Sequence, residues 1–282
     1  MTLPAFKAYD IRGRVPDQLN EDLARQIGYA MAEVLDPGAV VLGRDVRLTS
    51  GVLQTALAEG LRSAGRDIID IGLCGTEEVY FQTDCLGAAG GVMVTASHNP
   101  MDYNGMKLVR HEARPISGDT GLFTIRDAVE AGLQALPVLS GSIQSAPDKS
   151  AYIKHLLGYI NLSAIKPLKI VVNAGNGGAG SIVDLLAPHL PIEFVRVFHE
   201  PDGNFPNGIP NPLLPGNRGA TSEAVMAHGA DFGIAEHPTL PGTHVGGSDE
   251  QLDRRGSQSL EIDALFQDGL QGIEGTGIEV VG

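Results

Sequence analysis

Residues 95–100 read Thr-Ala-Ser-His-Asn-Pro and offer this sequence's best candidate for covalent chemistry. They follow an apolar run at residues 91–94 that is typical of a buried strand. Because the Asn-Pro pair breaks that strand, the hydroxyl of Ser97 is predicted to lie at the strand's carboxyl end. Ligands bind at this edge of open α/β sheets. Ser97 is therefore a candidate to carry a covalent intermediate.

Strands and helices are predicted to alternate around this motif. Thr49 or Ser50 is expected to cap the first helix with a side-chain oxygen, and Gly65 to end it. This alternation indicates βαβ units and a largely parallel sheet. The predicted strands are residues 40–43, 68–72, 90–95 and 106–109, and the predicted helices are residues 52–64, 77–86 and 119–134.

A second alternating unit follows residues 136–148, whose Ser, Pro and Gly content is typical of a linker. Its glycine-rich residues 173–180 could cradle phosphate at a helix N-terminus. They lack the Lys-Ser/Thr ending of a P-loop and fit the dinucleotide fingerprint poorly, so we favour a tight strand-to-helix turn. Strands are predicted at residues 168–173, 192–197 and 230–235, and helices at residues 152–160, 182–187 and 222–228.

The composition limits the classes of function. The chain has 282 residues, 43% of them hydrophobic, which suffices for a sizeable core in one or two domains. A net charge of −14 argues against nucleic acid and anionic membranes as partners, although a local cluster of cations can still bind a small anion. Two cysteines indicate reduced thiols, and no signal peptide or membrane span is visible. We therefore expect a cytoplasmic protein.

Several separated motifs resemble those of the α-D-phosphohexomutase family. Residues 95–100 look like its phosphoserine loop, residues 6–13 like its N-terminal motif, and residues 104–107 like the segment just after the serine loop. Similarity to the bacterial phosphomannomutase branch adds residues 75–78, 113–119 and 201–206. Motifs in the right order are more specific than any one alone. The resemblance runs from about residue 5 to residue 235.

The resemblance implies both a fold and an activity. The fold is a three-layer α/β/α domain with a mixed, largely parallel sheet at residues 1–140. A second, similar but incomplete domain follows at residues 149–235, and residues 236–282 form an atypical tail. The activity is interconversion of mannose 6-phosphate and mannose 1-phosphate through a phosphoserine and a bound hexose bisphosphate.

The resemblance also assigns roles to individual residues. Ser97 carries the phosphate, and a seryl phosphate is a dianion that must be neutralised. Arg12 can grip phosphate oxygens through its planar fork, whereas Lys107 acts as a point charge. His98 either transfers a proton or shapes the loop. The implied catalytic residues are Ser97, His98, Lys107 and Arg12, and the implied substrate-binding residues are Tyr9, Arg12 and Lys107.

The sequence departs from the family pattern after Ala235. The resemblance implies Mg²⁺, bound partly through the phosphate on Ser97 and partly by a loop of three alternate aspartates directly after residues 230–235. Here Glu236, His237 and Pro238 follow instead, and they do not supply the oxygen ligands that Mg²⁺ prefers. The family's sugar-reading and phosphate-clamping domains are not recognised either. We expect very weak or no turnover from this polypeptide, and a frameshift, truncation or fusion as the origin of the tail.

Two alternative functions stay open. The chain could be a catalytically inactive remnant or a binding partner of a full-length homologue, or it could be a phosphoglucomutase. The residues that would choose between mannose and glucose lie in the part of the pattern that is missing. The sequence leaves the oligomeric state open.

Overall fold

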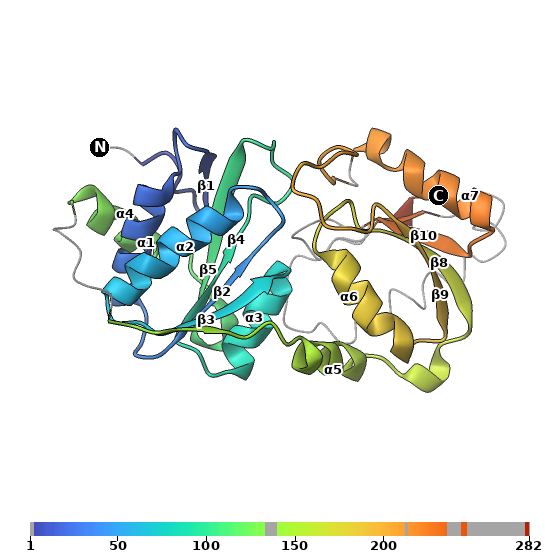
Figure 1. Cartoon of the computed structure of the whole chain (residues 1–282), viewed down its shortest axis with the longest axis horizontal. Coiled ribbons are helices and arrows are strands. Elements are labelled where there is room, and N and C mark those ends of the chain that lie inside the picture. The colour runs from blue at the N-terminus through green and yellow to red at the C-terminus, as the bar shows by residue number, and fades with distance from the viewer. Residues whose placement is uncertain (1–2, 133–139, 212–213, 236–243, 247–279, 282) are drawn as a thin grey trace. The chain divides into compact units, whose positions relative to one another are not determined.

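The computed structural model describes residues 3–132, 140–211, 214–235, 244–246 and 280–281. Its contacts divide the chain into two compact units, Met1–Asp148 and Lys149–Gly282 (Figure 1). Each unit is built around its own sheet. No helix in these described ranges has both the length and the apolar character that crossing a bilayer requires.

A mixed sheet forms the centre of the first unit, in the order β1-β5-β4-β2-β3-β7, with β6 beside β5. Strands β2, β3, β4 and β7 run parallel to one another, while β5 is antiparallel to both β4 and β1. The strands are β1 (Ile11–Arg14), β2 (Val40–Arg44), β3 (Ile68–Leu73), β4 (Gly90–Val94), β5 (Tyr103–Arg110), β6 (Arg114–Pro115) and β7 (Ile143–Ser145).

Helices cover both faces of this sheet and complete three layers (Figure 1). Helices α1 (Glu21–Val34), α2 (Ser50–Ser63) and α4 (Leu122–Glu130) bury one aliphatic core, and α3 (Thr76–Cys85) buries a smaller one on the other face. Helices α1 and α2 cross closely, because a Cβ on either Gly28 or Gly60 would overlap a main-chain carbonyl of the facing helix. The predicted three-layer architecture with a mixed, largely parallel sheet is confirmed.

The second unit has a five-stranded sheet in the order β12-β11-β10-β8-β9. Helix α6 (Ala179–Leu186) packs on one face and α7 (Gly219–His228) on the other, with α5 (Ser150–Gly158) beside α6. The strands are β8 (Leu168–Asn173), β9 (Ile192–Val197), β10 (Phe232–Ala235), β11 (His244–Gly246) and β12 (Val280–Val281). The prediction of a second α/β domain of similar build is thus confirmed.

Several local expectations need correction. The helix expected at residues 119–134 is shorter, because Gly121 at φ 132° separates a 3₁₀ turn, Gly118–Thr120, from α4. Part of the expected linker forms strand β7, which pairs in parallel with β3. The remaining 3₁₀ turns are His111–Ala113, Leu162–Ala164, Ala187–His189 and Pro215–Asn217.

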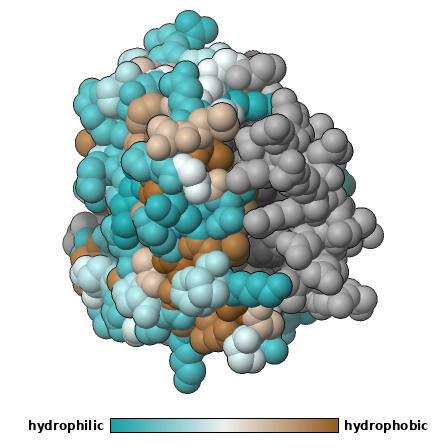
Figure 2. Space-filling view, turned by 90° about the vertical axis from the view of Figure 1, so that its right-hand side faces the viewer, coloured by the Kyte–Doolittle hydropathy of each residue, from teal (hydrophilic) through white to brown (hydrophobic). Residues whose placement is uncertain are grey.

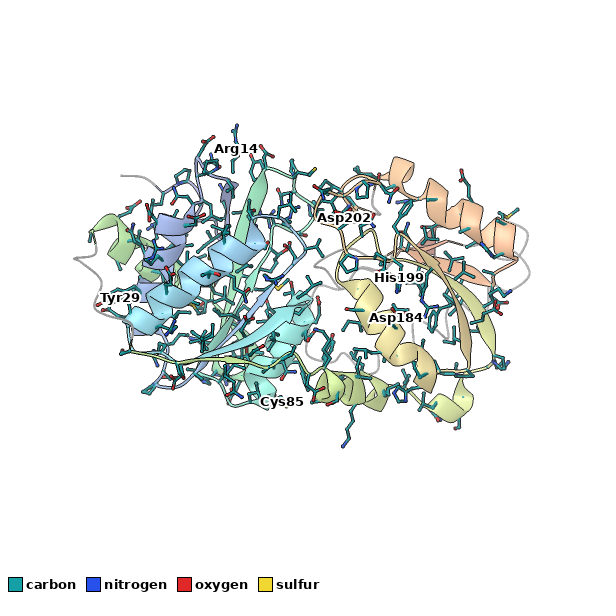
Figure 3. The ribbon with its side chains drawn as sticks, in the orientation of Figure 1. Arg14, Tyr29, Cys85, Asp184, His199 and Asp202 are labelled. Carbon is teal, nitrogen blue, oxygen red and sulfur yellow. The ribbon has the colours of Figure 1, made fainter. Side chains whose placement is uncertain are left out.

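Asp184 lies at the centre of a charged cluster on the surface of the second unit. Asp184 on α6 accepts hydrogen bonds from Arg196 and from Nε2 of His199, each at 2.8 Å (Figure 3). These bonds hold the pKa of Asp184 below its usual range.

Figure 2 shows a face of the molecule on which apolar patches lie among hydrophilic side chains. Apart from β11 and β12, the tail expected at residues 236–282 lies outside the described residues.

Candidate active site

The predicted serine lies on the loop between β4 and β5, at one edge of the first sheet. Because β5 is antiparallel to β4, this edge holds the end of β4 and the start of β5. Strand β1 ends at the same edge, since Arg14 pairs with Tyr103. Strand β2 ends there too, parallel to β4. Residues from four chain segments therefore surround the loop, as expected for a site at the carboxyl edge of a sheet.

Ser97 has a strained backbone. Its φ of 56° is left-handed, and its residue exposure is only 4%. Its amide donates to Oγ1 of Thr95 at 2.9 Å, and its Oγ lies 3.2 Å from Nδ1 of His98. A left-handed non-glycine residue costs about 1–2 kcal/mol. Such strain persists only where the surroundings impose it, and it is concentrated at functional sites.

Arg47 hydrogen-bonds to the main chain of this loop at four carbonyl groups. Its Nη2 donates to the carbonyl oxygens of Ser97 at 2.8 Å and Asn99 at 2.5 Å, and its Nη1 donates to those of Pro100 at 2.8 Å and Tyr103 at 3.1 Å. A hydrogen bond to a charged group contributes about 1.5–3 kcal/mol. Four such bonds are large enough to offset the strain at Ser97.

Arg47 is itself held by the turn between β2 and α2. Its Nε lies 3.5 Å from Oδ2 of Asp45, and its amide donates to Oδ1 of the same carboxylate at 3.0 Å. Ser50 Oγ donates to that Oδ1 at 2.6 Å. Asp45 and Arg47 are both buried. One acidic side chain therefore orders the turn and lies beside the buried guanidinium.

Asn104 connects this turn to β5. Its fully buried side chain donates to Oγ1 of Thr49 at 2.8 Å and to Oγ of Ser50 at 2.9 Å. The expectation that Thr49 or Ser50 caps α2 is therefore wrong. Thr49 stands at the N-cap position, but no capping bond from its side chain is present there. Both hydroxyls hydrogen-bond within the network beneath the serine loop instead.

The two cations predicted for the site, Arg12 and Lys107, lie on β1 and β5. Arg12 pairs with Gly105 across the two strands, and the carbonyl of Gly105 accepts a bond of 2.9 Å from the amide of Thr95. A Cβ on Gly105 would overlap the carbonyl of Ile11 and lie 2.9 Å from that of Thr95. Only glycine lets β1 approach the serine loop this closely. Lys107 lies two residues further along β5, so it faces the same side as Gly105.

Both cations act on His98, the neighbour of Ser97. Burial lowers the pKa of His98 below its usual range, and the positive charges of Arg12, Arg47 and Lys107 lower it further. This shift favours the neutral form of the imidazole. The structure thus places Arg12, Arg47 and Lys107 within electrostatic reach of the loop that carries Ser97. A cationic field of this kind favours a phosphate dianion.

Two of the predicted site residues, Arg12 and Tyr9, lie in β1 or just before it. Arg12 forms an ion pair of 2.6 Å with Asp10. Tyr9 is 81% exposed on the turn before β1, and its role in substrate binding stays a prediction. In the second unit, residues 173–180 form the favoured strand-to-helix turn between β8 and α6, with Asn173 bonded to Thr221 at 3.0 Å.

The described residues do not provide a metal centre. They contain no group of three or more His, Cys, Asp or Glu side chains able to hold an ion. Residues 236–243, which directly follow β10, lie outside the described part of the chain. The described residues thus fit a Mg²⁺ ion only to the extent that a phosphate on Ser97 would supply ligand oxygens.

Comparison with known proteins decides the family. Residues 4–135 match the model of phosphoglucomutase/phosphomannomutase α/β/α domain I, and residues 150–239 match that of domain II. The chain belongs to the phosphoglucomutase/phosphomannomutase family. The predicted α-D-phosphohexomutase resemblance is confirmed.

Curated relatives and solved structures agree with this assignment. The chain is 75% identical over 235 residues to a protein from Xanthomonas campestris pv. campestris described as phosphohexose mutases, covering 83% of this chain and 52% of that protein. It is 57% identical over 241 residues to a Salmonella typhimurium phosphomannomutase, covering 83% of this chain and 53% of the relative. The crystal structure of a Burkholderia thailandensis family member matches with a TM-score of 0.79 at 34% identity, over 93% of this chain and 60% of that one. The chain therefore spans about half the length of the curated relatives it matches.

The sequence reasoning missed Asp45 and Arg47 as parts of this candidate site, and it placed Asn104 in a family motif without giving it a role. A signal for the first two was present, because Asp-Val-Arg at residues 45–47 comes right after the predicted strand at residues 40–43. Polar residues at strand ends on one sheet edge are expected to converge. The carbonyl groups that Arg47 binds, however, lie about fifty positions away in the chain. No local pattern could have identified those contacts.

Proposed function

We propose that Ser97 of this chain accepts and returns the phosphoryl group in a phosphomannomutase reaction, which interconverts mannose 6-phosphate and mannose 1-phosphate. The observation that carries this proposal is the strained, buried Ser97 at the sheet edge, beside an imidazole on which three cations act. Phosphoryl transfer depends mainly on positioning and on stabilisation of charge. The Salmonella relative's description as a phosphomannomutase supports mannose as the sugar.

The proposed transfer conserves atoms and charge. A hydroxyl of the hexose phosphate attacks the phosphorus on Ser97, so the new sugar O–P bond forms as the Ser97 Oγ–P bond breaks. The proton of that hydroxyl ends on Ser97 Oγ. The hexose bisphosphate then turns round and returns its other phosphoryl group to Ser97 by the reverse step. The product is the isomeric hexose monophosphate.

Each candidate residue has a role in this proposal. Arg12 and Lys107 neutralise the phosphate, the first as a fork and the second as a point charge. His98, at 3.2 Å from Ser97 Oγ, exchanges the proton with that oxygen or fixes its orientation. Tyr9, on the exposed turn before β1, contacts the sugar. We also propose a cytoplasmic location, consistent with the two free cysteines Cys74 and Cys85.

We include Mg²⁺ in the proposal because the family resemblance implies it. When bound, Mg²⁺ would spread the charge that develops on the transferring phosphoryl group. The phosphate on Ser97 would supply part of its ligand set. Because Glu236, His237 and Pro238 stand where the family pattern has three alternate aspartates, we propose that turnover by this chain is strongly impaired.

A coupled assay tests the function. Mannose 1-phosphate or glucose 1-phosphate is supplied with Mg²⁺ and a hexose 1,6-bisphosphate, and appearance of the 6-phosphate is followed. We expect slow turnover, faster with mannose than with glucose, that Ser97→Ala abolishes. Turnover unchanged in Ser97→Ala would contradict the proposal. Absence of turnover together with phosphate on Ser97 would support the inactive remnant, with a competent serine in an incomplete site.

A further inference from the structure

We propose that Arg47 is a positioning residue for phosphoryl transfer, which holds Ser97 in the one backbone conformation that presents its oxygen to the phosphorus. The positioning of the loop rests on contacts in the first unit alone. Its consequence for phosphoryl transfer rests on the function proposed above. The two parts make separate predictions.

The first step of the argument is that a single side chain fixes most of the loop. The guanidinium of Arg47 binds four carbonyl oxygens between residues 97 and 103. Main-chain bonds within this stretch are short-range, such as Asn99 to Ala96 at 3.1 Å and Tyr103 to Pro100 at 3.1 Å. These local bonds close turns. Near the far end of the stretch, the amide of Val15, just after β1, donates to the carbonyl of Asp102 at 2.8 Å. The part of the loop around Ser97 and Asn99 is attached to the β2–α2 turn by Arg47.

The second step is that the same turn fixes both ends of the loop. The amide of Asp45 donates to the carbonyl of Val94 at 3.0 Å, just before the loop begins. Arg47 then binds the carbonyl of Ser97 and, at the far end, that of Tyr103. The hydrogen bonds from the β2–α2 turn therefore position the serine loop at both of its ends. A shift of this turn would move Ser97 with it.

The third step is that a planar fork is required. Two Nη atoms each bridge two carbonyl oxygens, and the side chain that carries them is 2% exposed. An ammonium group has three donors around one nitrogen and cannot reproduce this spread of directions. Arg47→Lys therefore keeps the charge but loses part of the geometry. This substitution separates positioning from electrostatics.

Arg66 offers a matched control. Its guanidinium also binds main-chain carbonyls, those of Ala32, Leu35 and Asp36 at 2.5–2.7 Å, around the end of α1. It precedes the start of β3 and lies at the opposite edge of the sheet from the end of β4. Arg66→Met removes a comparable set of bonds without touching the serine loop. General loss of stability would affect both variants.

The kinetic test measures phosphate uptake by the full 282-residue chain. Each variant is mixed with increasing hexose 1,6-bisphosphate, and phosphate on Ser97 is followed by mass spectrometry. We expect Arg47→Met to lower the saturating rate about 100-fold, with the half-saturating concentration changed by less than about threefold, because misplacement affects the reacting geometry. The saturating rate of Arg47→Lys should lie between those of Arg47→Met and the unaltered chain. The rate of Arg66→Met should stay within about twofold of that of the unaltered chain. Wild-type rates in Arg47→Met, or full recovery in Arg47→Lys, would overturn the inference.

Hydrogen exchange tests the loop itself and needs no phosphate. The amides of Ser97, Asn99 and Tyr103 donate bonds within the loop. We expect them to exchange at least about tenfold faster in Arg47→Met, or in Arg47→Lys if the methionine variant does not fold, and to be unchanged in Arg66→Met. Unchanged exchange in the Arg47 variants would overturn the inference. If the unaltered chain takes up no phosphate while this loop signature is present, the proposed function fails and the positioning role stands.

Discussion

At the residue scale, the left-handed backbone of Ser97 lowers the stability of the fold and fixes the position of the serine hydroxyl. A serine at φ 56° is less stable than a glycine there would be, because its Cβ crowds the backbone in the left-handed region. Proteins retain such strain where activity depends on it. The buried hydroxyl beside His98 is the feature that the strain maintains.

Two substitutions at Ser97 separate the effect of backbone strain on stability from the effect of losing the hydroxyl. Both Ser97→Gly and Ser97→Ala lose the oxygen, but only alanine keeps the Cβ. We expect the glycine variant to be more stable than the alanine variant by about 1 kcal/mol in urea unfolding. Neither variant should accept phosphate at this position. An alanine variant as stable as the glycine variant would show that the left-handed backbone is not strained.

His98 reports on the charges around the serine. Burial and then Arg12, Arg47 and Lys107 lower its pKa, so it should titrate below its usual range when the imidazole is followed by NMR. Lys107→Met should raise that pKa, and phosphorylation of Ser97 should raise it further, because each change makes the field less positive. The conservative variant Lys107→Arg, which keeps the charge, is the control. A titration of His98 at or above its usual range would contradict the described electrostatics.

The sign of the stability effect follows from the same shift. The unfolded chain binds a proton on His98 at the ordinary pKa, whereas the folded chain binds it only at lower pH. The contribution of His98 to stability is therefore complete above the ordinary pKa. It is lost as pH falls from that value through the lowered one.

At the element scale, the site depends on the close approach of β1 to the serine loop. Gly105→Ala would force a Cβ into the carbonyls of Ile11 and Thr95. We expect a loss of about 1–3 kcal/mol in urea unfolding, as for other overpacked positions, and slower phosphate uptake because Arg12 moves. The matched control is Gly51→Ala at the start of α2, where only Nε of Arg44 lies within reach, at 4.0 Å. Equal stability of the two variants would argue against this close packing.

The elements also show what sequence patterns can predict. Strands β8 and β9 coincide with the predicted residues 168–173 and 192–197, because runs rich in β-branched residues such as Ile and Val favour strands. Strand β7 was missed, since its Ser and Gln residues resemble a linker and only pairing with β3 makes them a strand. Ser97 could be proposed from its place after a strand. The place of Arg47 after a strand offered the same kind of signal, but its four contacts could not be predicted. They are distant in sequence, and a main-chain carbonyl does not depend on residue type.

At the scale of the whole molecule, charge is unevenly distributed. The chain has a net charge of −14, yet Arg12, Arg47 and Lys107 act together on the loop at one sheet edge. A local positive field in an acidic protein suits a small anion and not a polyanion such as nucleic acid. Ser97, His98, Arg12, Arg47 and Lys107 all belong to the first unit, which buries its own core.

The most direct measurement is the position of phosphate after the full chain is incubated with a hexose 1,6-bisphosphate. Peptide mapping by mass spectrometry should find one phosphoryl group, on Ser97, and none on any residue of the Ser97→Ala variant. Phosphate on another residue, or none on the unaltered folded chain, would contradict the account of Ser97 as the phosphoryl-carrying residue.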